Sequence, residues 1–199
     1  MGTDLILASA SPSRTRILHD AGVHHVVEPA GIDEEEIKAS LAAAGAVPQA
    51  VSETLAELKA TQVGTRRPGA LVIGADQVLE YADRLFDKPR DLDHARAHLV
   101  TVRGRIHRLV ASVCVVRDGR RLWHHNDTAE LQMRDFSDDF LDWYLAKAGR
   151  TVCQSVGAYQ LEGLGAHLFA RVRGDYFTIL GLPLLPLLEF LRGYDMVPR

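Results

Sequence analysis

Residues 71–75, Leu-Val-Ile-Gly-Ala, are apolar without alternation. A strand with one solvated face alternates apolar and polar side chains, so this run is typical of a central strand that is covered on both faces. Helical apolar faces occur nearby, with Val51, Leu55 and Leu58 on one of them. The order of strands and helices along the chain predicts an α/β fold with a mixed sheet and flanking helices, and not a doubly wound parallel one.

Turn residues and apolar periodicity predict the remaining elements. Strands are expected at 4–8, 24–27, 71–75, 106–116 and 121–133, with a hairpin over 77–85 that turns near Ala82 and Asp83. Helices are expected from Pro12 to about Asp20, on either side of the break at Gly45 and Pro48, and over 91–102, 137–149 and from Pro183 onward. The 199 residues are expected to form one domain, 1–199, with two lobes around a cleft.

Composition excludes several classes of protein. The formal charge of −3 argues against a protein that coats nucleic acid, which needs a basic stripe. No apolar run approaches the roughly 18 residues of a membrane span, and Asp4 lies where a signal peptide needs positive charge. Cys114 and Cys153 fit no disulfide framework or zinc ribbon, so buried reduced thiols and a cytoplasmic location are expected.

The segment Leu7–Arg14 combines a strand end with a helix start. Ser11 is a good N-cap and Pro12 suits the first helical turn, so free backbone N–H groups should create an anion site there. Arg14 and Arg16 place positive charge against the helix dipole, a conflict that a bound anion would relieve. The alternative is an ordinary helix cap with solvent-facing arginines.

Asp76 follows the buried run and should mark the C-terminal end of that strand, where open α/β sheets place active-site groups. It can hold a metal or accept a proton from water; alternatively, it is only a turn residue. Lys59 borders an apolar helix face, and Pro89 makes Lys88 extended, so both lysines are candidates for phosphate contacts, with ordinary surface lysines as the alternative. The acidic run 33–36 could supply a further metal-binding carboxylate or only a solvated helix start. The chain contains no P-loop, no Gly-x-Ser-x-Gly elbow and no His-Glu-x-x-His motif.

Taken together, these segments resemble the Maf family, first described as septum-formation inhibitors and related to the inosine triphosphate pyrophosphatases. The resemblance spans almost the whole chain and rests on these motifs in this order: LILASASPSR at 5–14, LAELKA at 55–60, VIGADQ at 72–77, DKP at 87–89, GRIH at 104–107, GAY at 157–159, EGLG at 162–165 and GLPL at 181–184. It implies a mixed α/β fold with a nucleotide cleft, often as a homodimer. It also implies hydrolysis of a nucleoside triphosphate to a monophosphate and pyrophosphate with Mg²⁺ or Mn²⁺.

The resemblance assigns roles residue by residue. Ser9, Arg14, Lys59 and Lys88 match phosphate-binding positions, and Glu34 matches an acidic position that would hold metal. Asp76 matches the family's catalytic carboxylate, usually called the proton acceptor, although it could equally hold the metal.

Three positions, Ser13, Gln77 and Glu162, match those that differ between substrate branches. Gln77 and Glu162 agree with the 7-methyl-GTP branch and not with the dTTP/UTP branch, whereas Ser13 replaces the aromatic residue of the former. A carboxylate suits the two adjacent donors of guanine, which favours a guanine-type or modified purine base.

Two alternatives to this enzyme are a metal-dependent phosphatase that releases orthophosphate and a nucleotide-binding regulator of cell division with little turnover. The joint presence of Asp76, Glu34, Lys59 and Lys88 favours the pyrophosphatase.

Overall fold

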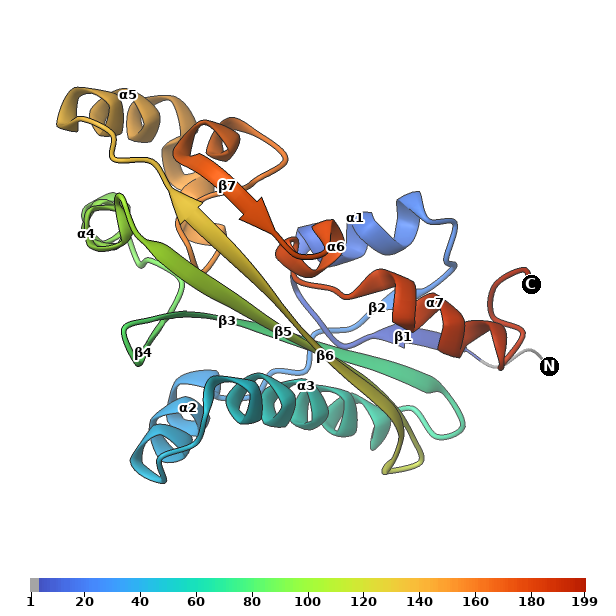
Figure 1. The fold of residues 1–199 in the computed structure, drawn as a ribbon. Coiled ribbons are helices and arrows are strands. Elements are labelled where there is room, and N and C mark those ends of the chain that lie inside the picture. Colours follow the sequence, from blue (N-terminus) through green and yellow to red (C-terminus); the bar gives the residue numbers. More distant parts are fainter. Residues whose placement is uncertain (1–3) are drawn as a thin grey trace. The chain divides into compact units, whose positions relative to one another are not determined.

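The computed structural model describes residues 4–199, and Figure 1 shows its helices and strands. The chain divides into two compact units. The first comprises Met1–Gln77, Ala111–Asp127 and Tyr176–Arg199, and the second comprises Val78–Val110 and Thr128–Asp175.

Seven strands in the described chain form one sheet of mixed direction, in the order β2-β1-β3-β5-β6-β7, with β4 paired to β3. Their bounds are β1 Leu5–Leu7, β2 Val26–Val27, β3 Leu71–Tyr81, β4 Arg84–Phe86, β5 Ile106–Arg117, β6 Arg120–Met133 and β7 Phe169–Arg173. β1 is parallel to both β2 and β3, whereas β4 and β7 run antiparallel to their partners. The predicted mixed α/β fold is therefore confirmed.

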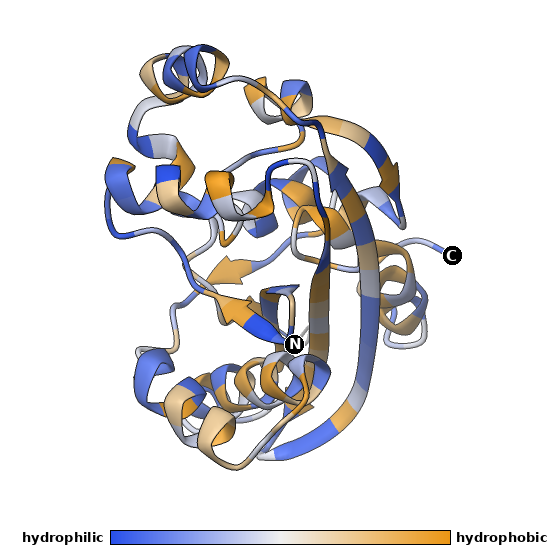
Figure 2. Cartoon of the chain, turned by 60° about the vertical axis from the view of Figure 1, so that its left-hand side comes forward, coloured by the Kyte–Doolittle hydropathy of each residue, from blue (hydrophilic) through white to orange (hydrophobic). Residues whose placement is uncertain are grey.

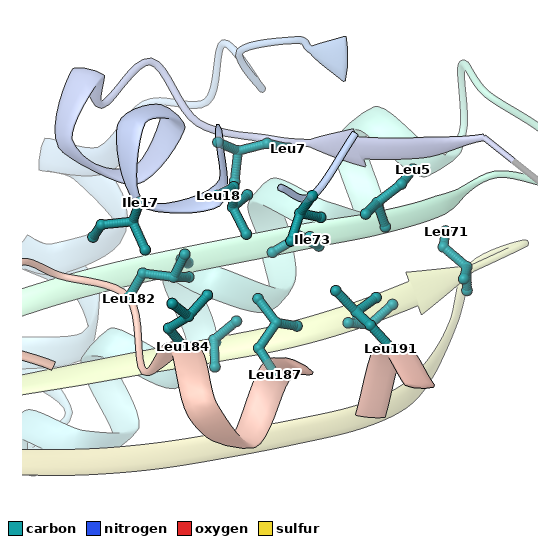
Figure 3. Close-up of a cluster of buried hydrophobic side chains, with 14 residues drawn as sticks. Leu5, Leu7, Ile17, Leu18, Leu71, Ile73, Leu182, Leu184, Leu187 and Leu191 are labelled. Carbon is teal, nitrogen blue, oxygen red and sulfur yellow. The ribbon is translucent and has the colours of Figure 1, made fainter. Parts of the chain in front are cut away.

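The first unit holds helices α1 (Pro12–Asp20), α2 (Glu34–Ala43), α3 (Pro48–Gly64), α6 (Tyr176–Ile179) and α7 (Leu184–Arg192). α3 covers one face of its strands, while α1 and α7 cover the other (Figure 1). Figure 3 shows Leu184, Leu187 and Leu191 pointing from α7 toward the strands, where they join a buried cluster with Leu7 and Ile73.

Successive side chains of β3 point alternately toward α3 on one face of the sheet and toward α1 and α7 on the other. Leu71, Ile73 and Ala75 belong to the cluster on the α7 side, whereas Val72 packs with Ala56 and Ala60 of α3 in a second cluster. Because side chains alternate along a strand, Gly74 and Asp76 face α3 together with Val72. Hydrophobic residues fill β1 and most of β3, whereas the long strand β6 and the helices mix hydrophobic and hydrophilic residues (Figure 2).

The second unit holds α4 (Leu92–Val102), α5 (Asp138–Ala148), the short 3-10 helices η1 (Gly149–Gln154) and η2 (Leu164–Leu168), β4 and β7. Its core includes His107, whose Nε2 lies 2.7 Å from the hydroxyl of Tyr159. Both side chains are buried, and Tyr159 packs edge-on against Phe169.

Most predicted elements agree with the structure, but the strand expected at 24–27 is shortened to Val26–Val27 and the central strand is longer than expected. The predicted strand 71–75 and the first arm of the hairpin are one strand, β3, which continues through Asp76 to Tyr81; the turn at Ala82 and Asp83 follows as predicted, and both residues have positive φ. Cys114 is buried and Cys153 is half-buried, and both thiols are free. Among residues 4–199, no helix is both long and apolar enough to cross a bilayer.

Candidate active site

Asp76 and Lys59 form the centre of a buried charged cluster in the first unit. The Lys59 Nζ atom donates a hydrogen bond of 2.7 Å to Asp76 Oδ1. The side chains of Asp76 and Lys59 are only 5% and 8% exposed. The prediction that Lys59 is a phosphate-binding candidate is compatible with this position, whereas the alternative of an ordinary surface lysine is wrong. Asp76 Oδ2 is also buried and has no hydrogen-bond partner within the described part of the chain.

Asp76 lies within β3 and not at the end of a strand as the sequence suggested. Its parallel neighbour β1 stops at Leu7, which pairs with Ile73, and the N–H of Ala8 still donates to the Ile73 carbonyl at 2.8 Å. β3 therefore runs on past the carboxyl end of β1. The predicted location beside the carboxyl end of a strand holds for β1, because Asp76 lies three residues beyond this last pairing.

Glu34 joins the cluster from α2. Asp33 caps this helix by accepting a 3.0 Å hydrogen bond from the N–H of Glu36, which fixes Glu34 in the first turn. A carboxylate oxygen of Glu34 lies 3.0 Å from Lys59 Nζ, whereas Glu35 and Glu36 are exposed. Of the three consecutive glutamates, Glu34 is thus the one that reaches the lysine.

Ser9 and Arg14 lie together at the start of α1. Ser11 caps the helix as predicted, and Arg14 turns inward, where it is 9% exposed. Its Nη1 donates to Ser9 Oγ at 3.1 Å and its Nε donates to the carbonyl of Gly181 at 2.8 Å. The alternative of solvent-facing arginines therefore applies to Arg16, which is exposed, and is wrong for Arg14.

Electrostatics link Arg14 to the same cluster. Burial lowers the pKa of Arg14 from its ordinary value, while the charges of Asp76 and Glu34 oppose that fall. Two carboxylates and two cations thus balance one another across Arg14, Asp76, Glu34 and Lys59. Asp76, Lys59 and Arg14 are buried and Glu34 is partly exposed. A charge cluster of this kind, with one carboxylate oxygen that has no partner among residues 4–199, can bind an anionic ligand and take up a proton from a water molecule.

The three positions expected to govern substrate choice lie in different surroundings. Ser13 is partly exposed in the first turn of α1. Gln77 is partly buried next to Asp76, and its side-chain Nε2 donates to the carbonyls of Thr178 and Ile179 at 2.9 and 3.1 Å. Glu162 belongs to the second unit, where it is exposed just before η2.

Lys88 also belongs to the second unit. It lies between β4 and α4 with its side chain exposed, and the following Pro89 is buried. The first unit therefore brings together Ser9, Arg14, Glu34, Lys59, Asp76 and Gln77, whereas Lys88 and Glu162 come from the other unit.

Sequence reasoning missed the contribution of residues 178–181. This segment accepts hydrogen bonds from both Gln77 and Arg14, and Thr178 in turn donates to Asp127 Oδ2 at 2.6 Å. These partners are more than 50 residues apart in each case. The only sequence signal in this segment was the glycine of the motif at 181–184. It was not sufficient, because a glycine gives no indication of the side chains that contact it.

Comparison with known proteins gives a consistent result. Residues 4–194 match the family described as Maf-like protein. A nucleoside triphosphate pyrophosphatase of Paramagnetospirillum magneticum is 57% identical over 97% of this chain and 100% of its own length. One of Granulibacter bethesdensis is 51% identical over 96% of this chain and 97% of its own length. A 7-methyl-GTP pyrophosphatase of Rhizobium etli is 48% identical over 96% of each chain.

The family match covers every residue of the cluster around Asp76, together with Lys88 and Glu162. The relatives align over almost their full length at about half identity or more, so the similarity is not confined to one motif. The chain belongs to the Maf family.

Proposed function

We propose that this chain hydrolyses a nucleoside triphosphate to a nucleoside monophosphate and pyrophosphate at the cluster around Asp76. The relatives named nucleoside triphosphate pyrophosphatase support this reaction. The single observation that carries the assignment of the site is Oδ2 of Asp76, an atom that is buried beside Lys59 and has no hydrogen-bond partner among residues 4–199. An unsatisfied buried carboxylate oxygen is costly, and such atoms in native proteins frequently serve catalysis.

In this mechanism Asp76 orients a water molecule through Oδ2 and accepts its proton. The water oxygen forms a bond to the α-phosphorus, and the bond from that phosphorus to the α,β-bridging oxygen breaks. Pyrophosphate departs with the bridging oxygen and the electron pair. Arg14, held by Ser9, and the backbone N–H groups at the start of α1 stabilise the negative charge that develops on the phosphates.

Lys59 has a positioning role in addition to its charge. It contacts both Asp76 and Glu34, so it sets the distance between the two carboxylates and neutralises part of their repulsion. Lys88, from the second unit, is proposed to bind a phosphate as a further cation. The phosphate-binding role of both lysines follows from the family positions that they occupy, whereas the positioning role of Lys59 follows from its contacts with the two carboxylates.

A divalent cation fits the residues present. No group of three or more His, Cys, Asp or Glu side chains with a metal-binding arrangement occurs among residues 4–199. Mg²⁺, however, binds through one or two carboxylates together with substrate phosphates, and Asp76 Oδ2 and the partly exposed Glu34 supply such oxygens. Glu34 would therefore hold Mg²⁺ or Mn²⁺, joined by Asp76 in the alternative in which its Oδ2 binds the metal and not the water. The ion would supply charge neutralisation for the triphosphate and a more acidic water.

The proposed substrate carries a guanine-type or modified purine base. Glu162 is exposed and offers only hydrogen-bond acceptors, which match the N1–H and amino donors of guanine. The similarity to a 7-methyl-GTP pyrophosphatase supports this class of base. The small side chain of Ser13 does not supply the stacking surface expected for a methylated base, so GTP and 7-methyl-GTP should be compared directly.

The family resemblance also supports a single functional domain over 1–199, a homodimer and a cytoplasmic location. Light scattering during size-exclusion chromatography tests the dimer. A monomeric mass at micromolar concentration would contradict it.

The test of function is a nucleotide panel with purified protein and Mg²⁺ or Mn²⁺, in which pyrophosphate and orthophosphate are measured separately. We expect pyrophosphate, with a ranking of bases led by GTP or 7-methyl-GTP. Asp76→Asn should lower kcat by about 10²–10⁴-fold with nucleotide binding retained, because it removes the proton acceptor. Asp20→Asn, an exposed aspartate on α1, is the matched control.

Each other outcome has a defined meaning. Orthophosphate as the first product would indicate a phosphatase. Binding without turnover on any nucleotide would favour the regulator of cell division. Calorimetric titration with Mn²⁺ separates the roles of Asp76: unchanged metal affinity in Asp76→Asn identifies a base, and lost affinity identifies a ligand.

A further inference from the structure

Two buried polar side chains of the second unit have no role in the proposed hydrolysis. His107 on β5 is 1% exposed and Tyr159 is 4% exposed, and Nε2 of His107 lies 2.7 Å from the Tyr159 hydroxyl. The other ring nitrogen of His107, Nδ1, is buried and has no hydrogen-bond partner among residues 4–199. A buried polar atom without a partner costs stability, so the pair is not explained by the stability of the core.

The backbone next to Tyr159 is held by hydrogen bonds from side chains. Ser155 Oγ accepts a 3.1 Å hydrogen bond from the N–H of Tyr159 and donates to the carbonyl of the same residue. The hydroxyl of Tyr144, on α5, donates to the carbonyl of Ala158 at 3.0 Å. His107 contacts the hydroxyl of the Tyr159 ring from β5. The sheet and a helix of the second unit therefore both hold this segment.

The segment is also strained. Ala158 has φ +58°, in the left-handed region that residues with a side chain rarely adopt. Such a backbone persists only where its surroundings enforce it, and it is concentrated at sites that hold ligands. A Cβ atom built on Gly157 would lie 2.2 Å from Cε1 of Tyr159, so the tyrosine ring packs directly on the backbone of the segment. The ring of Tyr159 is thus part of what enforces this shape.

Glu162 follows within a tight turn. The N–H of Gly163 donates to the carbonyl of Gln160 at 3.2 Å, and Glu162 lies inside the turn that this bond closes. A Cβ atom built on Gly165 would lie 2.4 Å from the Gln160 carbonyl oxygen, so the chain beyond the turn packs against the backbone of Gln160. Gln160 directly follows Tyr159. The turn is therefore fixed at Tyr159 on one side and at Gly165 on the other, while the side chain of Glu162 is exposed.

We propose that His107, Tyr144 and Tyr159 are positioning residues that hold the turn from which Glu162 reads the base. This inference rests on the proposed function, from which it takes the role of Glu162, and deepens it. A carboxylate on a rigid turn discriminates between bases because its position is fixed before the base binds. Removing an anchor should reduce that discrimination and leave the affinity for phosphates unchanged.

Analogues with a methylene group in place of the α,β-bridging oxygen test this without turnover. Tyr159→Phe removes only the hydroxyl. We expect it to change the ratio of the affinities for α,β-methylene-GTP and α,β-methylene-UTP about fivefold toward one, measured by calorimetry. Inorganic tripolyphosphate, which has no base, should bind as it does to wild type. Tyr194→Phe, at an exposed position, is the matched control and should leave both measurements unchanged.

The other two anchors provide independent variants. Tyr144→Phe removes the bond to Ala158 and should change the same ratio in the same direction. His107→Leu removes the partner of the Tyr159 hydroxyl and should do likewise. His107→Gln supplies a new partner and should restore the wild-type ratio, which a loss of packing alone would not allow. His24→Leu, at an exposed position, controls for the substitution itself.

A double-mutant cycle completes the test. In a Glu162→Ala background, Tyr159→Phe should cause no further change in the ratio, because its effect acts through Glu162. The proposal is overturned if the two substitutions add, or if Tyr159→Phe weakens the binding of tripolyphosphate and of α,β-methylene-GTP by the same factor. It is also overturned if the ratio responds to Glu162→Ala but not to Tyr159→Phe.

Failure of the proposed function gives different results. A ratio that does not respond to Glu162→Ala refutes the role of Glu162 as the reader of the base, and this inference with it. Absence of GTP hydrolysis, with the affinity ratio still dependent on Tyr159 and Glu162, refutes the reaction and supports this inference.

Discussion

A Cβ atom placed on Gly74 would lie 2.0 Å from the carbonyl oxygen of Ala56. The same atom would lie 2.8 Å from the Cβ of Ala60, so α3 rests on the backbone of β3 without a side chain between them. Asp76 lies two residues beyond Gly74 on this face of the strand, and Lys59 lies on the facing side of α3. The close approach at Gly74 therefore sets the 2.7 Å contact between Asp76 and Lys59.

Gly74→Ala should push α3 away from β3 and separate this pair. We expect a loss of about 1–3 kcal/mol in the free energy of unfolding, measured with urea, together with reduced turnover. Gly64→Ala is the control, since a Cβ there would meet Val116 at an ordinary 3.8 Å and alanine favours the helix. Equal stability of Gly74→Ala and wild type would show that the helix adjusts freely.

Removing Lys59 should cost more than removing its partner. Lys59→Met leaves Asp76 buried without its cation and should destabilise the chain by about 3–5 kcal/mol. Asp76→Asn should cost less, because Lys59 keeps its contact with Glu34.

In the double variant, Asp76→Asn should recover part of the stability lost in Lys59→Met, because no uncompensated buried carboxylate then remains at position 76. Chemical denaturation of the four proteins gives the coupling energy. Simple additivity would contradict a coupled pair.

Lys88→Ala should raise KM for the triphosphate or lower kcat by about tenfold, if its ammonium contacts a phosphate in the bound state. The free energy of unfolding should change little, because the side chain is exposed. Lys147→Ala, another exposed lysine of the second unit, is the control. Identical kinetics for the two variants would return Lys88 to the class of surface lysines.

Stability should fall in mildly acidic solution because of His107. Burial lowers the pKa of His107 from 6.5 to about 4. The unfolded chain binds a proton at this residue below about pH 6.5, whereas the folded chain does so only near pH 4. Each pH unit lost between these values should cost about 1.4 kcal/mol at most.

His107→Gln keeps a partner for the Tyr159 hydroxyl without titrating in this range, so it should flatten the pH profile of the unfolding free energy between pH 6.5 and 4. His24→Gln, at an exposed position, should leave the profile unchanged. His98, whose pKa is also about 4 because of burial, remains in both variants, so the difference between the profiles reports His107. Parallel profiles for the two variants would contradict the assignment.

Local patterns predicted much of this architecture. The caps at Ser11 and Ser137, the turn at Ala82 and Asp83, and the helix that begins after Pro183 follow from the chemistry of neighbouring residues. The length of β3 was underestimated because Asp76 was taken as the strand end, since aspartate is depleted in strands and favoured in turns. Here the pairing with neighbouring strands and the packing of α3 outweigh those preferences.

The arrangement of the site was less accessible from the sequence. The resemblance named Lys59 and Arg14, but nothing local showed that both are buried. Their environment depends on contacts distant in sequence, such as the one between Arg14 and Gly181. A periodic pattern shows which face of a helix is apolar. The residues against which that face packs are determined only by the tertiary structure.

The bond between Arg14 and Gly181 spans 167 residues. At a synthesis rate of about 5–20 residues per second, Gly181 is therefore added to the chain on the order of 10–30 s after Arg14. The hydrogen bond that holds the Arg14 side chain therefore cannot form until the chain has been made as far as Gly181, just before α7. A chain that ends before Gly181 thus lacks the carbonyl that holds Arg14, so the proposed phosphate site would be incomplete in it.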